Sequence, residues 1–336
     1  MSFIPDVYTV ECVTKGHPDR VCDQIADRIL AEITNQDPAA RVAVEVFGCK
    51  GILTIGGEVT TSARVDYEGL AREVLEGVGY DPVETRVHII SQSPQISQAV
   101  GTGGAGDQGI MYGYATDETK NYMPLGVELS RQLTAELERL RESGEIPWLK
   151  SDGKTQVTIR DGRPEVIVVS AQHDVSVSLE EVRETLLQKL VSPLLKAVRG
   201  SEEPSGSRRG GLRGVIVKSK VLINPAGAWS TGGFNADSGL TGRKLAVDGY
   251  GGIIPGGGGS THGKDNSKVD RSATAKAREV AVDLVRQGLA HECLISVAYA
   301  IGIDEPVMLH ALNENQEEIT PLLDPNVFLA SRLRAA

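Results

Sequence analysis

Hydrophobic and polar residues follow two different periods over the first quarter of the chain. An apolar residue at every fourth position over residues 18–33 predicts an amphipathic helix. Two-residue alternation over residues 42–47 and an apolar run over 52–55 lie on either side of a glycine-containing turn, which predicts a β-hairpin. A second helical pattern over residues 70–78 and a strand pattern over 86–90 follow. This part of the chain therefore predicts a mixed α and β unit.

The middle of the chain begins with a glycine-rich stretch and then returns to regular patterns. Residues 92–113 contain six glycines, too many for a regular element. A helix is predicted near residues 127–141. Strands are predicted at 155–160 and 165–171, because the Asp-Gly pair between them favours a hairpin turn. A Ser-x-x-Glu capping box begins a further helix over residues 178–190.

The last third of the chain contains a strand pattern, a long glycine-rich region and a final helix and strand. The strand covers residues 214–223, the glycine-rich region 227–263, the helix 273–287 and the last strand 294–301. Strand pairs with intervening helices thus appear three times. The fold class is therefore expected to be α+β, with three structurally similar lobes that each have a mixed sheet and helices on one face. The expected lobes span residues 1–100, 113–225 and 226–336.

Length and composition exclude several classes of protein. A chain of 336 residues exceeds one compact core, and its 40% apolar and 24% charged residues are typical of folded soluble proteins. Neither a membrane-length apolar run nor a secretory signal is recognisable, so a cytoplasmic protein is expected. The net charge of -10 argues against nucleic-acid binding. The four cysteines form no CxxC pair and are expected to be buried reduced thiols.

The densest candidate chemistry lies in the last glycine-rich region. DSGLTGRK covers residues 237–244, and GGGGSTHGKDNSKVDRS covers residues 256–272. Glycine lets the backbone approach phosphate oxygens, lysine supplies positive charge, and aspartate can hold a cation. The alternative interpretation of GGGGS is a flexible linker, but the flanking strand patterns and charged residues argue against it. A small cationic pocket in an acidic protein suits a compact polyphosphate.

A second candidate lies at the start of the first predicted helix, where GHPDR covers residues 16–20. His17 and Asp19 would lie where free backbone N–H groups attract anions or their metals, although an acidic first turn also has an ordinary dipole explanation. Glu45 is either a carboxylate in an apolar setting or part of a solvated sheet face. There is no P-loop, Rossmann or kinase motif. The residues by themselves predict an enzyme that handles a metal-bound polyphosphate.

Taken together and in this order, the motifs resemble the methionine adenosyltransferase family over about residues 8–306. The motifs are GHPDR with DQIAD, GGEVTT (56–61), QSPQI (92–96), GAGDQGIMYGYATDET (104–119), DGKTQVT (152–158), DSGLTGRK and GKDNSKVDRSA.

The resemblance implies a fold, a reaction and a set of partners. The fold would be the three-lobed S-adenosylmethionine synthetase fold. The sulfur of L-methionine would displace the tripolyphosphate of ATP from the C5′ carbon, and the tripolyphosphate would be hydrolysed to phosphate and pyrophosphate. Mg²⁺, two ions per site, and K⁺ are the implied cofactors. A homodimer with shared active sites, or a homotetramer, is implied, with no nucleic-acid or membrane partner.

The resemblance also gives individual residues an expected role. It implies that catalysis rests on His17, Lys154, Arg243, Lys264 and Lys268. ATP would be bound by His17, Asp152, Lys154, Trp229, Asp237, Arg243, Lys244 and Lys264, with Trp229 stacked on adenine. Methionine would be held by Glu58, Gln92, Asp237 and Lys268, and Asp107 would belong to a loop that closes over the substrates. Mg²⁺ would be ligated by Asp19 and Asp270, and K⁺ by Glu45. Glu58 and Asp107 are expected from one subunit, and His17 and Lys264 from the other.

Four departures from the family pattern are visible. Arg20 replaces a lysine, Lys15 replaces an acidic residue, and Ala228 replaces an arginine. The C-terminal lobe is expected to be shortened, because the chain stops at Ala336 without the aromatic-rich end of the family. Two rival functions follow: a catalytically impaired regulatory subunit, and an ATP-dependent phosphotransferase of unknown type.

Overall fold

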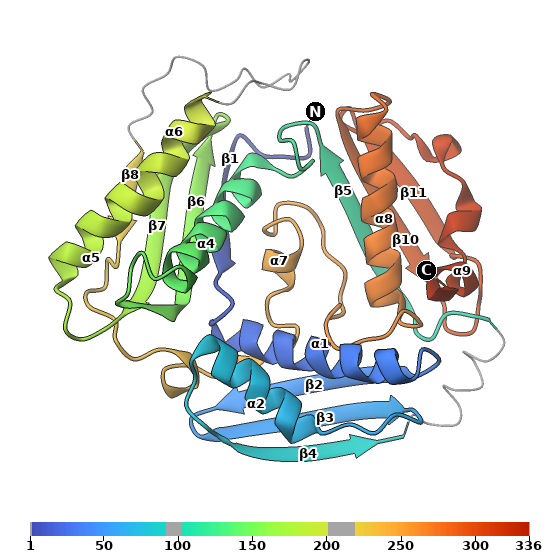
Figure 1. Cartoon of the computed structure of the whole chain (residues 1–336). Coiled ribbons are helices and arrows are strands. Elements are labelled where there is room, and N and C mark those ends of the chain that lie inside the picture. Colours follow the sequence, from blue (N-terminus) through green and yellow to red (C-terminus); the bar gives the residue numbers. More distant parts are fainter. Residues whose placement is uncertain (1, 92–102, 201–218, 336) are drawn as a thin grey trace.

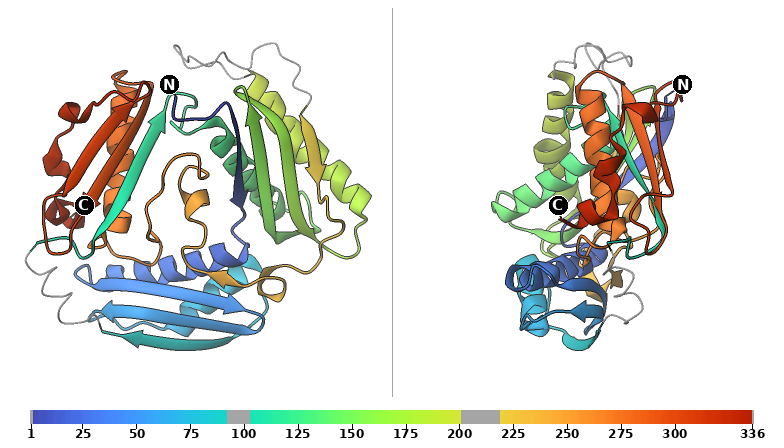
Figure 2. Two further views of the ribbon diagram at one scale, coloured as in Figure 1. Left: turned by 180° about the vertical axis from the view of Figure 1, so that it is seen from behind. Right: turned by 90° about the vertical axis from the view of Figure 1, so that its right-hand side faces the viewer.

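The computed structural model of the chain describes residues 2–91, 103–200 and 219–335. These residues form three lobes around a central segment that contains the short helix α7 (Leu245–Asp248) (Figure 1). Each lobe has its own sheet and its own cluster of buried apolar side chains. In all three lobes the helices lie toward one side of the molecule and the sheets toward the other (Figure 2). The expected α+β class with three lobes is confirmed.

The first lobe confirms the predicted hairpin and both predicted helices. Its sheet has the order β4 (Glu84–Ile90), β3 (Ile52–Thr60), β2 (Arg41–Cys49) and β9 (Gly239–Leu240). Two helices, α1 (Pro18–Gln36) and α2 (Tyr67–Val78), pack on one face of this sheet. The side chains at every fourth position of α1 are fully buried because they face the sheet. On the opposite face, which we call the open face, most strand side chains are half-buried or exposed among the described residues.

The second lobe contains a sheet in the order β1 (Val7–Val13), β6 (Leu149–Arg160), β7 (Arg163–His173) and β8 (Lys220–Ile223). Its helices are α4 (Leu125–Glu142), α5 (Leu179–Leu186), the π-helical turn η1 (Leu187–Val191) and α6 (Ser192–Gly200). The Asp161–Gly162 turn has positive φ at both residues, which suits the predicted hairpin. Ser178 caps α5, because its hydroxyl accepts the Glu181 N–H.

The third lobe corrects one prediction. Its sheet has the order β11 (Met308–Asn313), β10 (Glu292–Tyr299) and β5 (Gly109–Thr116). The expectation of no regular element up to residue 113 was wrong, because β5 begins at Gly109. A Cβ at Gly113 would lie 2.1 Å from the backbone of Ala277 in α8 (Val269–Arg286). Glycine in this strand therefore allows close helix packing.

Short elements complete the third lobe and the connections. They are η2 (Gly233–Asn235), η3 (Thr320–Leu322), η4 (Pro325–Phe328) and α9 (Ala330–Ala335). No helix within the described residues is long and apolar enough to cross a membrane.

The sheets exchange strands that are distant in sequence. β1 precedes the whole first lobe but pairs with β6 of the second, and β9 follows the second lobe but pairs with β2 of the first. The segment between β8 and α8 therefore crosses from the second lobe to the first and then to the third (Figure 1). This crossing brings its motif residues to the start of α1.

Candidate active site

The first group of candidate residues is built around Asp19 in the first turn of α1. Asp19 is fully buried. Its Oδ1 accepts the Leu240 N–H at 3.0 Å and lies 2.9 Å from the Arg243 Nε, while its Oδ2 pairs with the Lys244 ammonium. Burial raises the pKa of Asp19, but the Lys244 hydrogen bond and the other contacts outweigh it and hold that pKa below its usual range. Removing either cation would leave the buried charge of Asp19 less completely compensated.

His17 is the N-cap of α1 and is neutral at physiological pH. Burial, with help from the Lys244 ammonium, lowers the pKa of His17 to about 4. Its Nδ1 accepts the Asp19 N–H at 3.2 Å. The neutral ring therefore carries its proton on Nε2, which remains available to donate a hydrogen bond. Gly16 precedes it because a Cβ there would lie 2.4 Å from the Cβ of Ser151.

Asp152 on β6 belongs to the same group. Its Oδ2 accepts the Gly233 N–H at 2.8 Å, whereas its buried Oδ1 has no hydrogen-bond partner among the described residues. Burial raises the pKa of Asp152 to about 6, and the neighbouring Asp237 carboxylate adds to this effect. A buried acceptor without a partner is costly, so Asp152 is suited to receive a hydroxyl group from a ligand.

Lys154 and Trp229 lie at the borders of the first group. Lys154 is close enough to His17 to lower its pKa, and its Nζ lies 2.6 Å from an oxygen of Glu11. The backbone N–H of Trp229 donates to His173 Nε2 at 3.1 Å, and its indole Nε1 donates to the Thr231 carbonyl at 2.6 Å. These two bonds fix the tryptophan ring beside the loop that leads to Gly233.

The second group contains Lys264, Lys268, Asp270 and Glu58. Lys264 Nζ donates to Asp270 Oδ2 at 3.0 Å. Burial lowers the pKa of Lys268, and the nearby Glu58 carboxylate acts in the opposite direction. The Lys264 ammonium also lies close enough to Lys268 to lower the pKa of Lys268 further. The structure thus brings four expected site residues together at the start of α8.

Strand register places this second group on the open face of the first sheet. Lys264 forms a bridge opposite Ala43, Ala43 pairs with Glu58, and Glu58 pairs with Ile90. Residues directly opposite one another point to the same face. Lys264, Ala43 and Glu58 therefore belong to one row of side chains on this face.

The two groups are separated along β2. Thr241, two residues before Arg243, hydrogen-bonds to Val46 of β2, while Lys264 pairs with Ala43. Three residues of a strand span roughly 10 Å. The stretches that carry the two groups of cations therefore lie beside different parts of β2.

Three further expected residues lie elsewhere. Glu45 is exposed on β2, on the open face beside Phe47 rather than in an apolar interior. Asp107 is exposed just before β5, where its Oδ1 accepts the Gln108 N–H. Gln92 lies outside the described residues.

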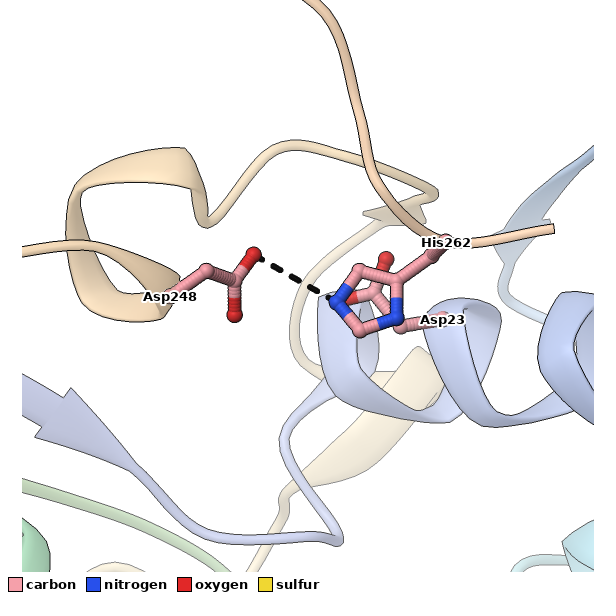
Figure 3. Close-up of side chains that lie close together, drawn as sticks. All are labelled: Asp23, Asp248 and His262. Atoms are coloured by element: carbon pink, nitrogen blue, oxygen red, sulfur yellow. Dashed lines mark ion pairs between the residues drawn. The ribbon is translucent and has the colours of Figure 1, made fainter. Parts of the chain in front are cut away.

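Sequence reasoning missed a cluster of charged residues behind the first group. Asp23 from α1, Asp248 from α7 and His262 from the following loop converge there (Figure 3). Asp27 accepts from His262 Nδ1 at 2.6 Å. The four-residue spacing of Asp19, Asp23 and Asp27 was the available signal, because it places all three carboxylates on one helix face.

The expected Mg²⁺ ligands fit that ion by their chemistry. Mg²⁺ in nucleotide sites is held by one or two carboxylates together with substrate phosphates. Asp19 and Asp270 each present a carboxylate that is neutralised by a lysine. Those lysines can turn to incoming phosphates and release the carboxylate oxygens. Glu45 offers a single exposed carboxylate, so a K⁺ ion there would require further oxygen ligands.

Comparison with known proteins identifies the family of the chain. Models of the S-adenosylmethionine synthetase N-terminal, central and C-terminal domains match residues 6–102, 102–229 and 231–324. An S-adenosylmethionine synthase of Desulforudis audaxviator (strain MP104C) is 42% identical over 332 residues, which cover 90% of this chain and 80% of the relative. S-adenosylmethionine synthase 1 of Rhodopseudomonas palustris (strain BisB18) is 44% identical over 319 residues, with 90% and 79% covered. The resemblance seen in the motifs is confirmed, and the chain belongs to the S-adenosylmethionine synthetase family, the methionine adenosyltransferases.

Proposed function

We propose that this chain synthesises S-adenosylmethionine from ATP and L-methionine and then hydrolyses the released tripolyphosphate to phosphate and pyrophosphate. In the first step the methionine sulfur forms a bond to C5′ of ATP while the bond from C5′ to O5′ breaks. The leaving tripolyphosphate takes the electron pair of that bond. No protein nucleophile is required, so catalysis rests on positioning and charge neutralisation.

The observation that carries this proposal is the fully buried Asp19 carboxylate paired with Arg243 and Lys244 beside a neutral His17. Arginine offers a planar fork and lysine a compact charge, and both suit phosphate oxygens. A neutral His17 can donate from Nε2 to the bridging oxygen without changing the charge of the site. Together these residues can bind the triphosphate and stabilise the departing oxygen.

Asp152 and Trp229 are assigned to the nucleoside part of ATP. The buried Oδ1 of Asp152 is an acceptor suited to a ribose hydroxyl. Trp229 is held by its backbone and indole hydrogen bonds, so its ring can stack on adenine. Asp237 lies close enough to Asp152 to raise its pKa and is therefore assigned to the same part of the site.

The ion cofactors we propose are Mg²⁺ and K⁺. Asp19 and Asp270 would each hold Mg²⁺, and Glu45 would hold K⁺. When bound, Mg²⁺ neutralises phosphate charge and orients the triphosphate. Lys244 and Lys264 would then contact phosphate rather than carboxylate. Their positive charge would lie beside the negative charge that develops on the leaving tripolyphosphate.

We further propose a homodimer in which each site combines the first group of one subunit with the second group of the other. The separation of the two groups along β2 supports this arrangement. The open sheet face supports it too, since Phe47, Ile52, Leu240 and Ile90 are 42%, 37%, 36% and 50% exposed there. Clustered apolar exposure of this kind is typical of an interface. A two-fold axis then supplies two identical composite sites.

The test is product identification by mass after purified protein is incubated with ATP, L-methionine, Mg²⁺ and K⁺. The expected products are S-adenosylmethionine, phosphate and pyrophosphate in equal amounts. A regulatory subunit would yield none of them. A phosphotransferase would yield ADP or a phosphorylated acceptor and no S-adenosylmethionine.

A further inference from the structure

Helix α1 carries three aspartates on one face, and each accepts a backbone N–H from the glycine-rich segment that crosses it. Leu240 N–H donates to Asp19 at 3.0 Å, Gly242 N–H to Asp23 at 2.9 Å, and Gly263 N–H to Asp27 at 2.9 Å. We call Asp19, Asp23 and Asp27 the aspartate ladder. It attaches two separate stretches of the crossing segment to a single rigid helix.

The attachment points adjoin the cations of both candidate groups. Gly242 directly precedes Arg243 and Lys244, and Gly263 directly precedes Lys264. Glycine is required at Gly263, which has φ of 68° and where a Cβ would lie 2.2 Å from the Val44 carbonyl oxygen. A shift of either glycine along α1 would therefore move a phosphate-binding cation.

Three cations balance Asp23, Asp27 and the neighbouring Asp248. Arg20 pairs with Asp248 and, at 3.2 Å, with Asp23. His262 Nδ1 lies 2.6 Å from Asp27. Its Nε2 lies 3.4 Å from Asp248 (Figure 3). Arg271 lies 3.6 Å from Asp27. Three acidic and three basic side chains therefore form ion pairs with one another. They come from α1, α7, α8 and the loop before Lys264.

The same geometry argues against a metal ion at Asp23, Asp248 and His262. Their ligand atoms lie within 4.8 Å of one another, as a metal site requires. However, the Arg20 Nη1 already contacts both carboxylates and lies 3.4 Å from His262 Nε2. Bonds to Asp248 and Asp27 outweigh burial and raise the pKa of His262 to about 10, so its ring is protonated and cannot ligate a cation. The position of a metal is already held by a guanidinium.

We propose that His262 and Arg20 are positioning residues: they lock the aspartate ladder to α7 and to the loop before Lys264, and so fix the cations of both groups relative to α1. This inference rests on the proposed function, because those cations are assigned to the triphosphate. Both side chains are engaged with the carboxylates of the cluster, and neither is assigned to substrate. Their effect on the reaction acts through the placement of Lys244 and Lys264.

The test compares His262→Gln, which removes the positive charge, with His262→Lys, which keeps it. Displacing a catalytic group by about 1 Å can lower turnover by roughly 100-fold. We expect His262→Gln to lower kcat by about 10- to 100-fold, because it loosens the loop that positions Lys264. His262→Lys should recover a clear part of that loss. Hydrogen exchange at the Gly263 amide should be faster in His262→Gln than in wild type.

His291→Gln is the matched control. His291 also lies 2.6 Å from a carboxylate through Nδ1, that of Asp117, but in the third lobe away from the ladder. This variant should leave kcat and Gly263 exchange as in wild type. A wild-type kcat with unchanged Gly263 exchange in His262→Gln would overturn the proposal. Equal losses in His262→Gln and His291→Gln, or a change confined to KM, would overturn it as well.

The His262 variants could fail to fold, and a second variant covers that outcome. If the His262 variants do not fold, Arg20→Lys replaces them: it keeps the charge but loses the fork between Asp23 and Asp248, so kcat should fall while the thermal midpoint stays within a few degrees. An unchanged kcat in Arg20→Lys then overturns the proposal.

If wild type makes no S-adenosylmethionine, the proposed function fails. Hydrogen exchange at the Gly242 and Gly263 amides of the His262 variants still tests the aspartate ladder.

Discussion

Burying a carboxylate is costly unless hydrogen bonds or cations compensate its charge, and the aspartates of this site differ in how far that compensation goes. Asp19 has two cations and a backbone N–H, so it stays ionised although it is fully buried. Asp152 is also buried, but its Oδ2 accepts the Gly233 N–H and its Oδ1 has no hydrogen-bond partner in the described part of the chain. This incomplete compensation is consistent with the proposed ribose contact of Asp152, because groups that serve a ligand are often not optimised for stability.

Asp152→Asn should therefore stabilise the free protein relative to wild type at neutral pH. Because burial raises the folded-state pKa of Asp152 to about 6, above the ordinary value of 3.8, its ionisation opposes folding progressively from pH 3.8 to pH 6 and fully above. The advantage of Asp152→Asn over wild type should grow as pH rises from 4 to 7, measured by chemical denaturation. ATP should bind more weakly to the variant. A stability difference that does not depend on pH would contradict this account of Asp152.

Residue patterns predicted part of this site. The motifs identified His17, Asp19, Arg243, Lys244 and Lys264 as candidates without any structure. The partners of these residues were not predictable from local sequence, because Asp19 meets Lys244 across more than two hundred positions of chain. Asp27 and His262 lie inside two of the motifs but received no role there, because their role depends on contacts that only the folded chain makes.

At the scale of elements, a glycine marks the place where strand β5 and helix α8 approach most closely. Gly113 lies in β5 under the backbone of α8, and an added Cβ would meet Ala277 at 2.1 Å. Glycine content alone suggested an irregular segment there, since composition does not distinguish a loop glycine from a packing glycine. The amphipathic helices were predictable because their apolar period records the face that the sheet buries.

Gly113→Ala and Gly77→Ala should change stability in opposite directions. The first forces α8 away from β5 and should destabilise the protein by about 1–3 kcal/mol. The second lies in α2, where nothing lies within 4 Å of an added Cβ, and should stabilise it by up to about 1 kcal/mol through helix propensity. Denaturant unfolding of both variants measures the two free energies. A stable Gly113→Ala variant would show that α8 does not pack on β5 as described.

For the whole molecule, the arrangement of three lobes explains why the site residues are dispersed in sequence. Strand patterns predicted three α+β units, but they gave no information on pairing between distant strands such as β1 with β6 or β9 with β2. Those pairings carry the crossing segment over α1 and assign Lys264 to the open face of the first sheet. The division of candidate residues into two groups follows from this topology.

Co-expression of His17→Ala and Lys264→Ala chains tests whether each site combines groups from two subunits. Each variant alone should be nearly inactive. Random pairing gives half of the dimers one intact and one doubly damaged site, so about a quarter of wild-type activity should return. His17→Ala with Arg243→Ala is the matched control, because both residues belong to the first group and no intact site can form. Absence of recovery in the first mixture, with mixed dimers confirmed by native mass measurement, would place both groups in one chain's site.

The central claim is that the chain breaks the bond between C5′ and O5′ of ATP rather than a bond to phosphorus. ATP labelled with ¹⁸O at the O5′ position tests it directly, with products analysed by mass after a single turnover with L-methionine, Mg²⁺ and K⁺. Displacement at carbon predicts that all the label leaves with the polyphosphate products and that S-adenosylmethionine carries none. Label retained on a nucleoside product would show phosphoryl transfer instead and would contradict the assignment of His17, Arg243 and Lys244 to a departing tripolyphosphate.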